Sequence, residues 1–80
     1  MDNIGIYQAS FKVAFSLQEP ILYEDLKYQA LDSWDSVGHM ELITHLENAF
    51  KISMEMDDVI DFSSYSIGKD IVGKYGITFD

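Results

Sequence analysis

Ser36 is the side chain of this sequence that is best placed for covalent chemistry. It follows Asp35 at the end of a polar, turn-prone stretch and opens an apolar pattern with helical spacing. His39 and His45 are the candidates for a base that would make the hydroxyl a nucleophile. No Gly-x-Ser-x-Gly elbow surrounds the serine, and no Ser-His-acid set is evident. We therefore interpret Ser36 as an attachment point rather than as a catalyst.

The two histidines favour a structural interpretation. His39 falls on the inward stripe of the expected helix, where a histidine hydrogen-bonded within the core is the usual state. His39 and His45 also lack a third ligand at zinc-site spacing. Acidic runs that start at Asp32 and Asp57 lack the glycine and glutamate of a calcium-binding EF-hand loop. We expect no catalytic residues, no enzyme activity and no metal site.

The charge of the chain is strongly negative and unevenly distributed. The sequence has 14 acidic and 5 basic residues, for a net charge of −9. Residues 32–61 hold eight of the acids against Lys51 alone. Nucleic-acid binding requires Lys and Arg to neutralise phosphates, so this charge argues against it. The concentration of acid favours a docking surface for basic proteins, although acidity also serves solubility.

Length and composition favour one soluble domain. Eighty residues without cysteine form a small core that no disulfide supports. No apolar run approaches the roughly 18 residues that a membrane span needs. The acidic start Met1-Asp2-Asn3 does not resemble a signal peptide. We expect a single domain over residues 1–80, a cytoplasmic location and a monomer.

Apolar spacing predicts an all-α, four-helix bundle with three main helices and one short third helix. The predicted helices cover residues 3–17, 36–50, 57–62 and 66–75. Glu19-Pro20 should end the first helix, and one helical turn is expected at 25–28 within a long loop. The loop should be anchored by apolar side chains at Ile21, Leu22, Leu26, Leu31 and Trp34.

The second helix carries the clearest pattern. Its inward stripe is His39, Leu42, Ile43, Leu46, Ala49 and Phe50. Its outward ridge is Ser36, Met40, Thr44 and Glu47. Either Asp35 or Ser36 supplies the N-cap, and if Ser36 does, its hydroxyl has only a structural role.

The other helices should also present apolar faces. In the first helix, apolar residues on a second face, including Val13, should leave the helix largely covered. In the short helix, Asp57 or Asp58 should cap while Val59, Ile60 and Phe62 face inward. In the last helix, Ser66 should cap, Gly76 should take the C′ position, and the buried residues should be Ile67, Ile71, Val72 and Tyr75.

The run Asp35-Ser36-Val37, followed by Glu41-Leu42-Ile43, Leu46-Glu47 and Phe50, resembles the acyl carrier protein family. The resemblance continues through Ile52, Met54 and the acidic pair at 57–58, and it covers roughly residues 20–76. Trp34 directly before the motif looks like the discrete carriers of specialised biosynthetic clusters. Ser33 and Gly38 depart from the family pattern, which often has glycine and an acid at these positions.

The resemblance implies a covalent cofactor on Ser36. A Mg²⁺-dependent phosphopantetheinyl transferase would add a 4′-phosphopantetheine arm from coenzyme A, and the thiol of the arm would hold an acyl group as a thioester. Other partners would be acyl-transferring or acyl-modifying enzymes with basic patches. The partner contacts implied for this chain are Asp35, Val37, Met40, Glu41 and Glu47. The candidates for lining an acyl pocket are Leu46, Met54, Val59 and Phe62.

Three alternatives remain open from the sequence. The cargo could be aminoacyl or peptidyl rather than acyl. The chain could also be a non-covalent helical interaction module of the same fold, with an unmodified Ser36. A small regulatory protein phosphorylated on Ser36 is the third.

Overall fold

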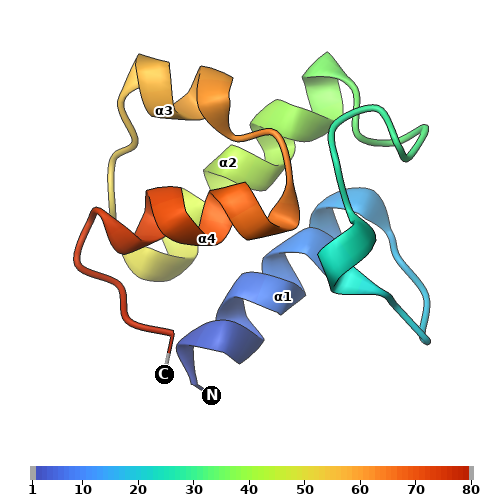
Figure 1. Ribbon diagram of the computed structural model, residues 1–80, viewed down its shortest axis with the longest axis horizontal. Helices are drawn as coiled ribbons and strands as arrows, with labels where there is room; N and C mark the ends of the chain where they lie inside the picture. Colours follow the sequence, from blue (N-terminus) through green and yellow to red (C-terminus); the bar gives the residue numbers. More distant parts are fainter. Residues whose placement is uncertain (1, 80) are drawn as a thin grey trace.

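Four α-helices and one short 3₁₀ turn build the protein, in a computed structural model that describes residues 2–79 (Figure 1). The elements are α1 (Asn3–Phe15), η1 (Tyr23–Asp25), α2 (Ser36–Phe50), α3 (Met56–Asp61) and α4 (Tyr65–Gly73). Over the described range no strand forms, and Lys27 and Ser64 make an isolated backbone bridge. The predicted small helical bundle with one short third helix is therefore confirmed.

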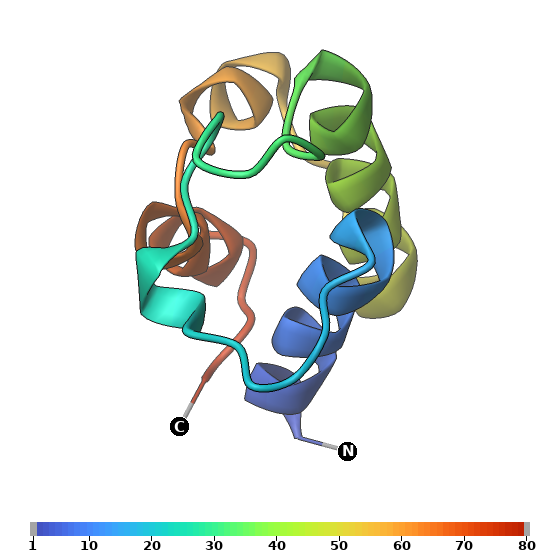
Figure 2. The same ribbon diagram turned by 90° about the vertical axis from the view of Figure 1, so that its right-hand side faces the viewer.

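The helices surround one core, with α1 and α2 packed against each other and α4 across from them (Figure 2). The segment between α1 and α2 crosses to the α4 side, where η1 contacts α4, and then returns to the start of α2. The Asn3 side-chain amide donates to the Thr78 carbonyl at 2.8 Å, which ties the two ends together. None of the helices within 2–79 has both the length and the apolar character needed to cross a membrane.

The core is rich in aromatic side chains. Tyr7, Phe11 and Trp34 are fully buried, and Phe11 meets the Trp34 ring edge-on with centroids 5.6 Å apart. The Tyr7 hydroxyl donates to the Tyr65 carbonyl at 2.7 Å and so joins α1 to α4. Burial raises the pKa of Tyr7 far above its ordinary value, so this hydroxyl stays protonated.

The first helix is shorter than the sequence predicts. Ser16 adopts a left-handed conformation, with φ of 52°, and the Leu17 amide donates back to the Lys12 carbonyl. This closing turn ends α1 before Pro20 can do so. Val13 is 63% exposed, so the expectation that α1 is largely covered was wrong for this face. The predicted turn at 25–28 is found two residues earlier, at η1.

The bounds of α2 match the prediction, and its cap is resolved. The Asp35 carboxylate accepts a hydrogen bond from the Gly38 amide at 2.9 Å, so Asp35 and not Ser36 is the N-cap. Leu42, Ile43 and Leu46 are buried as expected, whereas Ala49 is exposed.

The predictions for α3 were partly wrong. Glu55, rather than Asp57 or Asp58, occupies the N-cap position, and its side chain makes no capping bond. Phe62 is buried and Val59 is partly buried, as expected. Ile60, by contrast, is 69% exposed, since a helix of six residues can turn only one narrow face to the core.

The predictions for α4 also need correction at both ends. The helix begins one residue earlier than predicted, because the Ser64 hydroxyl, not that of Ser66, accepts from the Ile67 amide. Ile67 is 46% exposed, which contradicts its predicted burial, while Ile71 and Val72 are buried. Gly76 has the expected positive φ, 91°, but it lies beyond the C′ position because α4 ends at Gly73. In the loop before α2, Leu22 is 73% exposed and does not anchor the chain.

Candidate functional site

Ser36 is exposed at the first residue of α2, and its hydroxyl is not used by the fold. The capping bond that a serine often makes at this point comes instead from Asp35. Between residues 2 and 79, no hydrogen bond to the Ser36 hydroxyl is found. The serine is therefore held on a rigid helix end while its oxygen remains available for chemistry.

A close approach of two backbone segments fixes the position of Ser36. A Cβ at Gly38 would overlap the Ser33 carbonyl oxygen and lie 3.2 Å from the Phe15 ring. The Ser33 hydroxyl also donates to the Phe15 carbonyl at 3.4 Å. The absence of a side chain at Gly38 thus lets the preceding loop lie directly on the first turn of α2. This packing gives Gly38 a physical role that its departure from the family pattern did not suggest.

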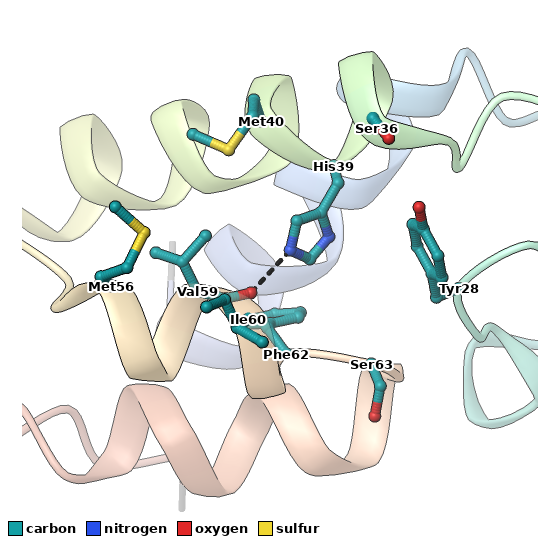
Figure 3. Close-up of a pocket in the computed structure, with 9 residues that line it drawn as sticks. All are labelled: Tyr28, Ser36, His39, Met40, Met56, Val59, Ile60, Phe62 and Ser63. Atoms are coloured by element: carbon teal, nitrogen blue, oxygen red, sulfur yellow. Dashed lines mark hydrogen bonds between the residues drawn. The ribbon is translucent and has the colours of Figure 1, made fainter.

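A cavity of about 410 Å³ opens beside Ser36, between α2, α3 and the loop that carries Tyr28 (Figure 3). Met40, Met56, Val59 and Ile60 give it an apolar part. Tyr28, Ser36 and Ser63 lie toward the other end. The remaining lining residues are His39 and Phe62. The cavity therefore has hydroxyl groups near Ser36 and apolar side chains farther from it.

His39 connects the loop, α2 and α3 through both ring nitrogens. The Trp34 indole Nε1 donates to His39 Nδ1 at 3.0 Å, and His39 Nε2 lies 2.7 Å from the Val59 carbonyl oxygen (Figure 3). An indole N–H can only donate and a carbonyl can only accept, so the network assigns the ring proton to Nε2. We call this chain of two bonds the Trp34–His39–Val59 relay. It confirms the structural interpretation of His39, because neither nitrogen is available as a base for Ser36.

Polar contacts hold the short α3 helix in place beside the cavity. The Glu47 carboxylate accepts from the Met54 amide at 2.8 Å. The Asp58 carboxylate accepts from the Tyr75 hydroxyl and forms an ion pair with Lys74. These two donors lower the pKa of Asp58 below its ordinary value, with the bond to Lys74 as the larger cause. Position and orientation of α3 thus depend on α2 and on the end of α4.

The surface around Ser36 combines exposed apolar side chains with carboxylates. Val37 is 70% exposed, Met40 52% and Met56 72%. A second, more open hollow runs along α2 on the other side of Ser36 and includes Glu41. Single exposed apolar residues are common, but a contiguous group beside an unused hydroxyl is typical of a contact surface.

Four of the five predicted partner contacts are exposed near Ser36, and the fifth is half-buried. Asp35, Val37, Met40 and Glu41 are exposed near Ser36. Glu47 is half-buried and bonded to the Met54 amide, so its carboxylate supports the connection between α2 and α3. It is less accessible to a partner than the sequence suggested.

Two of the four residues predicted to line an acyl pocket line this cavity, and the other two do not. Val59 and Phe62 line the cavity. Leu46 is fully buried in the core and Met54 is half-buried, and neither lines the cavity. Sequence reasoning missed Met56 and Ile60, although their spacing of four residues places them on one face of a helix and could have indicated them.

Comparison with protein-family models, curated proteins and solved structures finds no match. In the described part of the chain, no group of three His, Asp or Glu side chains is placed to hold a metal ion.

Proposed function

We propose that this protein is a carrier that holds an acyl group as a thioester on a 4′-phosphopantetheine arm attached to Ser36. The observation that carries the proposal is the exposed Ser36 hydroxyl, which the fold leaves unused at the mouth of a largely apolar cavity. The resemblance of the surrounding sequence to acyl carrier proteins gives the reaction class. The arm would supply a terminal thiol for thioester formation.

The residues present fit such an arm. The first amides of α2 have no partners within the helix, and the positive end of its dipole points toward Ser36. A phosphodiester on the Ser36 oxygen would therefore find a favourable electrostatic environment. In the loading step, the Ser36 oxygen would bond to the β-phosphorus of coenzyme A as the P–O bond to the α-phosphate breaks. The adenosine bisphosphate would leave, and the hydroxyl proton would pass to a base of the transferase.

The chain itself would contribute position and recognition rather than catalysis. His39 is engaged on both nitrogens, so its ring is not available as a base for Ser36. Asp35 and Glu41 would attract the basic surface of a transferase or client enzyme, and Val37 and Met40 would supply apolar contact. Attraction between opposite charges gives fast encounters without requiring a long-lived complex, which suits a protein that moves between enzymes.

The test is the intact mass of the protein before and after incubation with coenzyme A, Mg²⁺ and a broad-specificity phosphopantetheinyl transferase. We expect the gain of one phosphopantetheine, and its loss in Ser36→Ala. That variant should fold, because the hydroxyl makes no hydrogen bond within residues 2–79. Ser63→Ala is the matched control, since Ser63 is an exposed serine that lines the same cavity, and it should be modified fully.

An unmodified wild-type protein, alongside a carrier that the same enzyme does modify, would refute the proposal. The acidic and apolar surface around Ser36 would then support the alternative of a non-covalent interaction module. Modification of Ser36→Ala would refute the assignment of the site.

A further inference from the structure

His39, Val59 and Phe62 form part of the wall of the cavity beside Ser36, and the Trp34–His39–Val59 relay runs through this wall. Figure 3 shows the His39 ring between α2 and α3, with Met40 and Met56 to one side of the bond to Val59 and Tyr28 and Ser36 to the other. The relay therefore acts as a crossbar between the two helices at the base of the cavity.

The fully buried Trp34 side chain bonds the other nitrogen of the His39 ring. The His39 ring meets the Phe62 ring edge-on with centroids 6.1 Å apart and lies nearly parallel to the Trp34 ring, at 17°. Phe62 is also part of the cavity wall, whereas the fully buried Trp34 does not line the cavity. An alkyl chain that entered the cavity from Ser36 would meet Phe62 at the wall and would have to displace His39 to reach Trp34 and the core around it.

Passing His39 would break bonds that have no substitute. Separation of α2 from α3 would remove the acceptor of the His39 Nε2–H and the donor of the Val59 carbonyl. Displacement of the ring would leave the indole N–H of the fully buried Trp34 without an acceptor. Buried donors and acceptors that lose their partners are strongly unfavourable, and an alkyl chain offers neither.

The outer part of the cavity offers only partial shelter. Met56 and Ile60 line it but are 72% and 69% exposed. Methylene groups that lie there would stay in contact with water and gain little from burial. The part of the cavity near Ser36 is bordered by hydroxyl groups, which favour a compact or polar group over a long chain.

We propose that His39 is a specificity-determining residue, which limits the cargo of this protein to short acyl groups by closing the core to longer chains. The inference rests on the proposed carrier function. It can be tested without the transferase, because the chain contains no cysteine. A Ser36→Cys variant then carries a unique thiol at the mouth of the cavity.

The experiment attaches ethyl, hexyl and dodecyl groups to Ser36→Cys with alkyl methanethiosulfonates and confirms each by intact mass. The melting temperature of each adduct is then compared with that of the ethyl adduct. In the Ser36→Cys background, we expect the melting temperature not to rise with the length of the alkyl chain. After the further change His39→Leu, which removes the relay, the dodecyl adduct should melt at least about 5 °C above the ethyl adduct. Burial of one or two methylene groups in a domain of this size gives a shift of that order.

Asn48→Leu is the control. It also places a leucine on α2, but Asn48 is exposed and lines neither of the two hollows that include Ser36, so the adducts should behave as in Ser36→Cys alone. A rise of about 5 °C with chain length while His39 is present would overturn the proposal, even if His39→Leu does not fold. If the His39→Leu variant folds and the melting temperatures of its adducts also show no rise with chain length, the proposal is overturned as well. Neither result depends on whether Ser36 accepts phosphopantetheine, which the mass measurement above decides separately.

Discussion

Gly38→Ala should destabilise the protein, although alanine is the better helix former. Gly38 lies inside the first turn of α2 and is buried. Intrinsic helix propensity alone favours alanine over glycine by about 1 kcal/mol in a helix interior. A methyl group at this position, however, would overlap the Ser33 carbonyl oxygen. The sign of the effect depends on which of these contributions is larger.

The overlap should outweigh the propensity. Inserting a methyl group into a filled site typically costs about 1–3 kcal/mol. Here the obstructing atom belongs to the backbone of a loop that Trp34 anchors in the core, so it cannot rotate away as a flexible side chain would. A steric cost of about 2–3 kcal/mol, reduced by the gain of about 1 kcal/mol from helix propensity, gives a net loss of about 1–2 kcal/mol. For a domain of this size, that loss lowers the melting temperature by about 4–16 °C.

Thermal unfolding followed by circular dichroism measures this effect, with Gly73→Ala as the control. Gly73 lies at the end of α4, and a Cβ there would meet nothing within 4 Å. The same substitution should therefore leave the melting temperature unchanged or raise it. A higher melting temperature in both variants than in the wild-type protein would refute the close approach of the loop to α2. Gly38→Ala should also slow the modification of Ser36, since the loop before the serine must move.

Two further predictions concern contacts that join the helices. Tyr7→Phe should lower the free energy of unfolding by about 1 kcal/mol, because it removes the buried hydrogen bond to the Tyr65 carbonyl, and urea titration with an unchanged slope would measure it. Asp58→Asn should lower the melting temperature at neutral pH, because it removes the carboxylate that binds Lys74 and Tyr75. The pKa of Asp58 is lowered in the fold, so its stabilising contribution is present above the ordinary carboxyl range and is lost as the pH falls through the lowered pKa. The difference between the two proteins should therefore close at low pH, and a constant difference would contradict the assignment.

The parts of the fold that the sequence predicts well are those where several local signals agree. In α2, a long apolar stripe and an aspartate cap indicate the same bounds, and the structure has them at Ser36 and Phe50. The exposure of Ser36 followed from its place on the outward ridge. The inward orientation of His39, which is partly buried and hydrogen-bonded to Trp34 and Val59, followed from its place on the inward stripe.

The errors lie where a short element depends on its neighbours. Six residues of α3 carry too little periodicity to show that Ile60 faces outward. The left-handed Ser16 that ends α1 has no strong local signal, since glycine is the usual residue in that conformation. The partners of His39 come from the loop and from α3, and their distances depend on the packing of all three elements. Spacing along one helix cannot predict such a contact, and so the crossbar at the base of the cavity emerged only from the structure.

The place of Trp34 gives the site an intrinsic optical reporter. It is the one tryptophan of the chain, it is fully buried, and its indole nitrogen lies 3.0 Å from His39. Tryptophan emission depends on the polarity around the indole ring and on quenching by an imidazole in contact with it. Any event at Ser36 that moves α3 or the His39 ring will therefore change the fluorescence of the unlabelled protein. The loading of Ser36 that the proposed function requires would be followed in real time through this emission, without a dye attached to the surface around Ser36.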